Sequence, residues 1–255
     1  MNKQFVKQKM VLKHIRYASA SAVVLLCTAC ATGPNANSKD PMEPLNRGVY
    51  QFNDAVDRAL VKPVATVYRD VLPSPVRTGV TNFFANLQDV WSAVNNALQL
   101  KPVETVESFM RFGVNTVFGF AGVLDIASEM RIARHTEDFG QTLGYWGVGA
   151  GPYVVLPLLG PSTLRDTAAL PVDAQGNVVS QASDVPTRNS ATAVNLLNRR
   201  SRLLDATKML DQVALDPYTF TRDAFLQRRR SAVYDGNPPD EPEDVPLDDS
   251  AQSTK

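Results

Sequence analysis

The sequence predicts a mainly α-helical domain, and three observations support this fold class. Apolar residues recur at helical spacing through most of the chain between about residues 40 and 234. Prolines directly follow Asp40, Ser74 and Asp216, where a proline suits the first turn of a helix. The one candidate strand, Val154-Val155-Leu156, has no evident sheet partner. Residues 40–234 are enough for one domain with a sizeable core.

The first 29 residues are typical of an export signal and not of the fold. A basic start is followed by the short uncharged stretch Ala18 to Leu26, which is well below the roughly 20 apolar residues that a bilayer-spanning helix needs. Small residues then precede a cut site, which completes the pattern of a signal peptide. The basic residues are Lys3, Lys7, Lys9, Lys13 and Arg16.

The residues around Cys30 predict a lipid anchor. Thr28-Ala29-Cys30 resembles the lipobox of bacterial lipoproteins, in which the cysteine joins a diacylglyceride and becomes the new N-terminus. The three acyl chains that such a modification implies exceed the two lipid signals that stable anchoring takes. Cys27 replaces the usual Leu, and a conventional signal cut near Ala29 or Ala31 is the alternative. After cleavage Cys30 stands alone, so no disulfide or thiolate metal site is expected.

Both ends of the mature chain predict unstructured segments. Residues 30–39 are small and polar and read as a flexible tether. Residues 235–255 are acidic with four prolines and are expected to be disordered. Ala31, where an Asp would retain a lipoprotein in the inner membrane, implies the outer membrane by the sorting rule of many Gram-negative bacteria.

The charge distribution argues against nucleic-acid binding. The chain has 26 basic and 26 acidic residues, but five basic ones lie in the signal and many acidic ones in the tail. The body is therefore nearly neutral, and its only basic run is Arg228-Arg229-Arg230. Nucleic-acid binding requires a concentrated basic face, so no such partner is expected.

Three helices are predicted in the first half of the body. The first is expected to begin with Asp40 as its capping residue and Pro41 in its first turn, and to close or kink at Lys62-Pro63. The second begins at Ser74 and ends before Lys101-Pro102. The apolar stripe of the first helix comprises Leu45, Val49, Phe52, Val56 and Leu60. The apolar face of the second helix comprises Phe83, Phe84, Leu87, Val90, Trp91, Val94 and Leu98. The polar residues of the second helix lie largely off that face: Asn82, Gln88, Asp89, Asn95 and Asn96.

The third predicted helix, Thr105 to Ala127, is unusually apolar. Its middle, from Phe112 to Leu124, carries no charge and is too short to span a bilayer. We therefore expect a buried helix or one at a membrane interface.

Residues 139–166 contain six glycines and three prolines, a density that breaks regular helix. We expect a long ordered loop there, with a short helical or extended piece. Two further helices, 191–213 and 217–234, are predicted after it, and Asp216-Pro217 caps the last one.

No catalytic, metal or cofactor site is predicted. A single histidine, His135, remains after cleavage and cannot form a two-histidine metal site. The glycines at 147–151 lack the Walker lysine and the following helix of a phosphate loop. An enzyme such as a phospholipase stays an alternative, with His135, Ser128 and Glu129 as its best residues. Release of fatty acid by the purified protein, lost in His135→Ala, would support it.

Three blocks of the body together resemble one protein family. Asp40-Pro41-Met42-Glu43-Pro44-Leu45-Asn46-Arg47 and the following Phe52-Asn53 are similar to the opening motif D-P-x-E-x-x-N-R of the MlaA (VacJ) lipoproteins. Five segments resemble the central signature of that family: residues 139–144, 147–149, 151–153, 156–157 and 163–166. Residues 216–218 resemble its last block. Met42 and Pro44 depart from the residues usual in the family.

The resemblance implies a fold and a function. MlaA-like proteins form a helical ring or disc around an amphipathic channel in the inner leaflet of the outer membrane. They remove phospholipid from the outer leaflet, pass it to a periplasmic lipid-binding carrier protein and associate with a trimeric porin. Apolar helix faces such as 83–98 and 109–124 could then turn outward toward acyl chains.

The glycine-rich block is our candidate for a lipid path or gate. Small residues leave room for a lipid, and aromatic side chains suit the boundary between headgroup and tail. The candidates are Gly144, Tyr145, Trp146, Gly147, Gly149, Gly151, Pro152 and Tyr153. The alternative is that these glycines only shape the backbone.

A structural lipoprotein that scaffolds porins is the other reading. It predicts normal lipid distribution without the protein, and a water-soluble protein once Cys30 is replaced, whereas a membrane-seated ring would still require detergent.

Overall fold

The computed structural model describes residues 37 and 39–240. The predicted signal peptide at 1–29, the lipid anchor Cys30, most of the tether and residues 241–255 of the tail lie outside the described residues.

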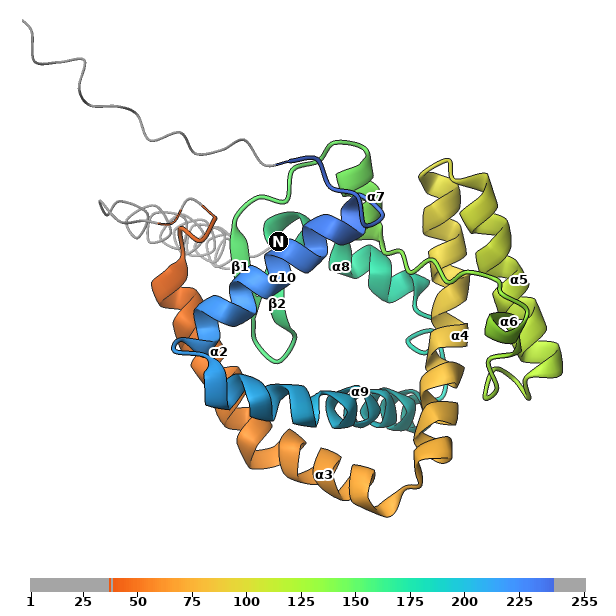
Figure 1. Cartoon of the computed structure of the whole chain (residues 1–255), viewed down its shortest axis with the longest axis horizontal. Helices are drawn as coiled ribbons and strands as arrows, with labels where there is room; N and C mark the ends of the chain where they lie inside the picture. The colour runs from red at the N-terminus through yellow and green to blue at the C-terminus, as the bar shows by residue number, and fades with distance from the viewer. Residues whose placement is uncertain (1–36, 38, 241–255) are drawn as a thin grey trace, which may run out of the picture.

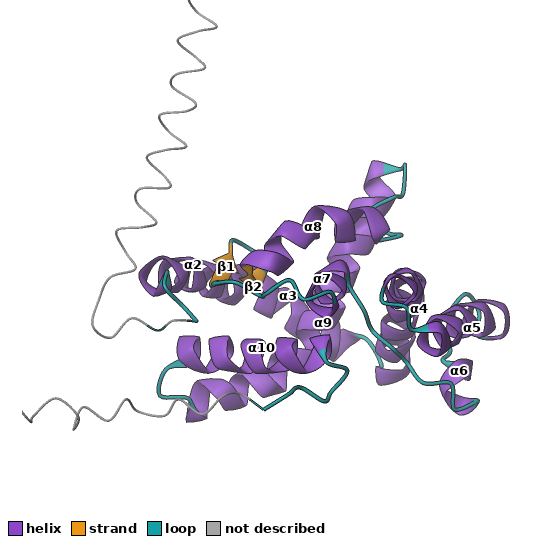
Figure 2. Ribbon diagram, turned by 90° about the horizontal axis from the view of Figure 1, so that it is seen from above, coloured by secondary structure: helices purple, strands orange, loops and turns teal. Residues whose placement is uncertain are grey.

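The described chain is mainly helical and closes on itself as a ring (Figure 1). Seen from above, α10 lies toward one face and α8 toward the other (Figure 2). In chain order the elements are α2 (Glu43–Val56), η1 (Asp57–Val61), α3 (Lys62–Val71), α4 (Ser74–Leu98), α5 (Pro102–Phe118), α6 (Ile126–Glu129), α7 (Phe139–Tyr145), β1 (Tyr153–Leu156), β2 (Gly160–Thr163), α8 (Leu164–Gly176), α9 (Val185–Val213) and α10 (Pro217–Val233).

The first predicted helix does not end at Pro63. A π-helical turn, η1, joins α2 to α3, and Pro63 lies in the first turn of α3. A proline has no amide hydrogen to donate, and the wider π turn accommodates it without ending the helix. The chain therefore continues helically from residue 43 to 71 and bends along the outside of the ring (Figure 1).

The second helix is confirmed as α4, whereas the third is shorter at its C-terminal end than predicted. α5 ends at Phe118, not at Ala127, because Phe120, Ala121 and Gly122 all take positive φ angles. Left-handed backbone cannot continue a right-handed helix. A Cβ on Gly122 would lie 2.5 Å from Nδ2 of Asn86, so the turn also packs tightly on α4.

The glycine-rich block is ordered, as predicted, but two of its elements were missed. The candidate strand 154–156 does have a partner: β1 pairs antiparallel with β2, with Tyr153 opposite Thr163 and Leu156 opposite Gly160. α8 follows directly, capped by the Thr163 hydroxyl, which accepts from the amide of Asp166. The last two helices are confirmed as α9 and α10, although α9 begins six residues earlier than predicted.

Two asparagines of α2 hold the free edge of β1. Asn46 donates to the carbonyl of Tyr153 (3.0 Å) and accepts from the amide of Val155 (2.9 Å). Two helical turns later, Asn53 donates to the carbonyl of Leu156 (2.9 Å) and accepts from the amide of Leu158 (2.7 Å). Each side-chain amide imitates a neighbouring strand, so the exposed edge of the hairpin is satisfied.

The interior is more polar than the interior of a water-soluble domain. Among the described residues, buried polar and charged side chains outnumber buried hydrophobic ones by more than two to one. On α4 the polar Asn86, Asp89 and Asn96 are buried, whereas Val94 and Leu98 of the predicted apolar face are exposed. The most deeply buried side of this helix is therefore polar, whereas the predicted apolar face is half-buried to exposed.

Apolar side chains gather instead on helices along the outside of the ring. We call these exposed residues of α2, α3 and α5 the apolar rim: Leu45, Phe52, Val64, Val67, Val71, Val103, Val106, Phe109, Met110, Val117 and Phe118. Single exposed apolar residues are normal on any protein, but a rim of this extent marks contact with an apolar phase or a partner.

Replacing Asn46 with Ala is expected to lower the free energy of unfolding by about 3 kcal/mol, because it leaves buried backbone groups of β1 unpaired. The melting temperature of the full chain in detergent should fall by roughly 6–12 °C. Asn189→Ala, at an exposed site on α9, is the control. Equal melting temperatures for the two variants would contradict the role of Asn46.

Candidate functional site

The opening motif joins the two ends of the ring. Asp40 is buried, and its Oδ1 accepts from Asn46 (2.8 Å). Its Oδ2 accepts from the hydroxyl of Tyr218 and from Nη1 of Arg222 (3.3 Å), both on α10. Asp40 is not the helix cap that the sequence predicted, because α2 begins at Glu43 without a side-chain cap. Its carboxylate serves instead to fasten α10.

Arg47 makes the second connection between these ends. Its Nη2 donates to Asp216 (2.6 Å), its Nε donates to Glu43 (2.7 Å), and its guanidinium lies 4.4 Å from the ring centre of Tyr218. Asp216 also caps α10, as predicted, by accepting from the amide of Tyr218. The hydrogen bond from Arg47 holds the pKa of Asp216 well below its ordinary value of 3.8.

The motif residues therefore hold structure together, and they do not form a pocket for chemistry. Pro41 is half-buried ahead of the helix, and Glu43 adds a carboxylate 3.5 Å from Arg222. Phe52 points to the exposed side and belongs to the apolar rim, whereas its neighbour Asn53 holds β1.

A second charged cluster ties the glycine-rich block to α10. Arg229 donates to both carboxylate oxygens of Asp138 (2.6 Å each) and to both of Asp166 (2.7 and 3.0 Å). Gly140 permits this contact, since a Cβ there would lie 2.5 Å from the Arg229 guanidinium. Arg165 donates to the carbonyl of Val148 (3.3 Å) and so fixes the loop.

The four glycines of the candidate gate differ in whether packing or backbone conformation requires a glycine. Gly144 is tightly packed, since a Cβ would lie 2.6 Å from the Arg165 guanidinium. Gly147 and Gly151 have positive φ angles and shape the backbone. Gly149 has neither constraint: its φ is not left-handed and nothing lies within 4 Å of a Cβ placed there. The carbonyl oxygen of Pro152 accepts a hydrogen bond from the amide of Leu164.

A cavity of about 970 Å³ lies between this loop and α10. Gly147, Gly149 and Gly151 line one side, and Leu226 and Val233 are among the residues that line the other. A cavity of this size could admit part of a lipid or a small ligand.

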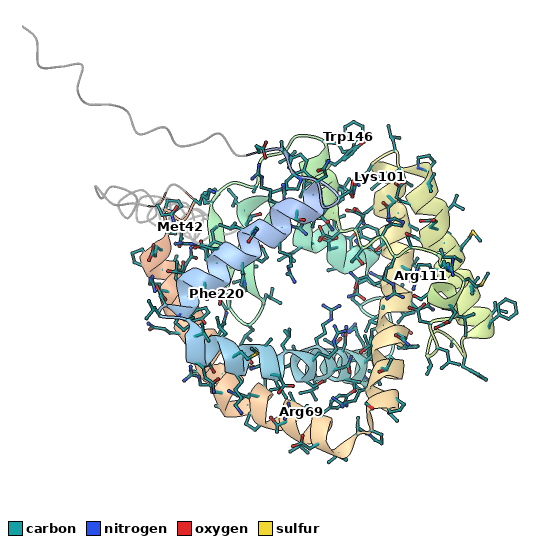
Figure 3. All side chains as sticks on the ribbon, in the orientation of Figure 1. Met42, Arg69, Lys101, Arg111, Trp146 and Phe220 are labelled. Carbon is teal, nitrogen blue, oxygen red and sulfur yellow. The ribbon has the colours of Figure 1, made fainter. Side chains whose placement is uncertain are left out.

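The three aromatic candidates do not stay together. Trp146 is 58% exposed and lies at the outer edge of the ring beside Lys101 (Figure 3). Its indole donates to the carbonyl of Leu98 (3.1 Å), and its ring meets that of Tyr145 edge to face. Tyr153 is instead fully buried against Tyr218, so it belongs to the core and not to a surface boundary.

The residues of the enzyme alternative do not form a catalytic group. His135 Nε2 lies 2.6 Å from Glu107, whereas the hydroxyl of Ser128 donates to Asp125 (2.7 Å). Glu129 is exposed at the end of α6. The part of the chain that the structure describes also contains no group of three acidic, histidine or cysteine side chains that could hold a metal.

Comparison with known proteins decides the family. A model of the MlaA lipoprotein family matches residues 38–232. The chain belongs to the MlaA lipoprotein family. The matched region extends from the opening motif on α2 through most of α10, so both partners of the ring closure lie within the MlaA family region.

Relatives with MlaA names cover most of the chain. The intermembrane phospholipid transport system lipoprotein MlaA of Escherichia coli (strain K12) is 36% identical over 223 residues, which is 86% of this chain and 88% of that protein. The Haemophilus influenzae protein of the same name is 33% identical over 94% of this chain and 98% of its own. A solved structure on the maintenance of bacterial outer membrane lipid asymmetry matches with a TM-score of 0.68 and 35% identity, covering 76% of this chain and 98% of that one.

Sequence reasoning missed the charged residues buried inside the MlaA fold. Arg111 of α5 donates to Asp125 (2.6 Å) and lies 3.6 Å from the buried carboxylate of Asp89 on α4. The available signal was that Arg111 is the one basic residue of α5, beside the apolar Phe109, Met110 and Phe112.

Arg47→Gln is expected to lower the melting temperature at pH 7 by roughly 2–4 °C, since the half-exposed pair with Asp216 is worth less than about 1 kcal/mol. A carboxyl with a lowered folded pKa stabilises the fold above its ordinary pKa, and this stabilisation is lost as pH falls toward the folded pKa. The difference in melting temperature between wild type and Arg47→Gln should therefore become smaller as the pH falls below 3.8.

Thermal unfolding between pH 7 and 2.5 measures this difference. Arg58→Gln, which breaks the exposed ion pair between Arg58 of η1 and Asp54 of α2, is the matched control and should keep a melting temperature close to that of wild type throughout. A difference in melting temperature between wild type and Arg47→Gln that grows at low pH would contradict a stabilising ion pair between Arg47 and Asp216.

Proposed function

We propose that this protein is the outer-membrane lipoprotein of a phospholipid transport system, which removes phospholipid from the outer leaflet and thereby maintains lipid asymmetry. The observation that carries the proposal is the reversal of polarity: buried side chains are mostly polar, while the apolar rim lies exposed on α2, α3 and α5. Such a molecule is suited to lie among acyl chains, because its hydrogen-bonding groups are covered by protein and its apolar groups are not.

A ring with a polar interior would lower the main barrier to lipid movement. Taking a charged headgroup through hydrocarbon costs several kcal/mol or more. In the view of Figure 3 the side chains leave the middle of the ring largely clear. Among the described residues, no helix is both long and apolar enough to cross a bilayer. We infer that the ring is seated within one leaflet.

The anchor and the partners complete the proposal. Cys30 would carry lipid and hold the ring on the periplasmic side of the outer membrane. A periplasmic lipid-binding carrier protein would accept the phospholipid, and a trimeric porin would be the partner in the membrane. Tyr145 and Trp146, exposed beside Lys101, would lie at the level of the headgroups.

Deleting the gene is expected to raise the amount of phospholipid exposed in the outer leaflet of intact cells. Wild-type protein should reverse the rise, whereas Cys30→Ala should not, because the ring would no longer be anchored. An unchanged outer leaflet on deletion would reject asymmetry maintenance and favour a scaffold for porins.

Gly149→Leu is expected to impair transport, because it adds bulk beside the cavity without forcing a strained backbone. Outer-leaflet phospholipid should rise toward the deletion level while the protein stays folded and anchored. Gly48→Leu is the matched control, since Gly48 also has open surroundings but lies on α2 away from that cavity. Equal lipid exposure in the two variants would mean that the loop is not a gate.

A further inference from the structure

Contacts to the outer helices fix the orientation of α9. Asn198 accepts from the hydroxyl of Tyr68 on α3 (3.2 Å) and donates to Thr81 on α4 (2.9 Å). Arg200 donates to Asp57 of η1 (2.8 Å). Figure 1 shows α3 on the outer side of α9 and the centre of the ring on its other side. The side of α9 opposite these contacts therefore faces the centre.

The residues of that central face follow from the helical period of about 100° per residue. They are Arg188, Thr192, Asn195, Arg199, Leu203, Ala206 and Leu210. The first four are polar or basic and the last three are apolar, so this face changes character along the helix axis. Leu203 is 53% exposed and Arg199 is exposed as well, so the middle of this face is not covered by protein.

Arg199 has no carboxylate partner in the described part of the chain. Its Nε donates only to the side-chain oxygen of Asn195 (3.2 Å). The two acids of α9 point elsewhere: Asp205 pairs with Arg69 (3.0 Å) and Asp211 lies 3.9 Å from Lys62. Burial nevertheless lowers the pKa of the Arg199 guanidinium, and the charge of Arg202 adds to this.

We propose that the central face of α9 is a phospholipid subsite, in which Arg199 binds the phosphate and Leu203, Ala206 and Leu210 contact the acyl chains. Guanidinium groups bind phosphate through two parallel hydrogen bonds. Arg199 and Leu210 are eleven positions apart, or roughly 16 Å along the helix, so a phosphate at one end leaves room for acyl chain along the other. The subsite rests on the proposed function and assigns it a residue.

Photocrosslinking in cells with ³²P-labelled phospholipid tests the subsite directly. A photoreactive amino acid is placed at Thr192 or Ala206 on the central face, or at Lys208 on the side toward α3 as the position control. We expect labelled adducts at the two central positions, with the mass of a glycerophospholipid, and few at Lys208. Absence of adducts at both central positions, or adducts with the mass of lipid A, would overturn the proposal.

Charge variants then test the role of Arg199. Arg199→Glu should reduce the Thr192 adduct roughly tenfold, since a charge-assisted hydrogen bond is lost and a repulsion is added. Arg199→Lys should keep most of it, and this variant separates loss of charge from misfolding. Lys208→Glu makes the same charge change on the same helix and should have no effect. An undiminished adduct in Arg199→Glu would remove Arg199 from the subsite.

Outer-leaflet phospholipid, measured in the same cells, separates the two proposals. A rise on gene deletion without adducts on α9 would leave transport standing and reject this subsite. Adducts that depend on Arg199, without a rise on deletion, would retain the subsite as a lipid-binding surface and reject asymmetry maintenance.

Discussion

The fold depends on the contact that joins its two ends. A ring made from one chain has to be closed by residues distant in sequence, and here Asp40 and Arg47 meet Asp216, Tyr218 and Arg222 on α10. The contact thus joins the first helix of the ring to the last, while α5 packs on α4 outside the circle and α6 packs on α5 (Figure 1). The partners are charged or hydrogen-bonding groups with defined geometry, so they fix both the position and the direction of α10. An apolar contact would fix neither as closely.

The polar interior follows from the surroundings that the ring requires. When the outside is apolar, burying apolar groups gives little advantage, because lipid solvates them as well as the protein core does. Hydrogen bonds and ion pairs then supply the specificity, as in the Arg229 cluster with Asp138 and Asp166 and in the hold of Asn46 on β1. In a medium of low dielectric these contacts are strengthened, and leaving any of them unpaired is costly.

The sequence predicts the helices better than their arrangement. The period of the apolar residues located α2 and α4, because it depends only on neighbouring turns, and the Asp216-Pro217 cap located the start of α10. It could not show which side of α4 faces the protein, since the usual rule assumes water outside. The sequence did not predict the left-handed turn at Phe120, because only Gly122 of its three residues favours that conformation. It did not predict the hairpin either, because the second strand begins with Gly160-Pro161, which are unusual in strands. The buried roles of Asp40 and Tyr153 depend on α10, which lies about 180 and 70 residues away, respectively.

If the ring lies within one lipid leaflet, as proposed, the π turn at Asp57–Val61 lets its wall curve without a break in the helix. A wall that changed direction through a loop would expose amide and carbonyl groups to hydrocarbon, at a cost of several kcal/mol for each. Here the main chain curves while it remains helical from Glu43 to Val71, so its peptide groups stay bonded to one another on both sides of the bend. The same turn admits a proline, whose missing hydrogen leaves one donor fewer to satisfy. Curvature is thus obtained without presenting bare peptide to oil.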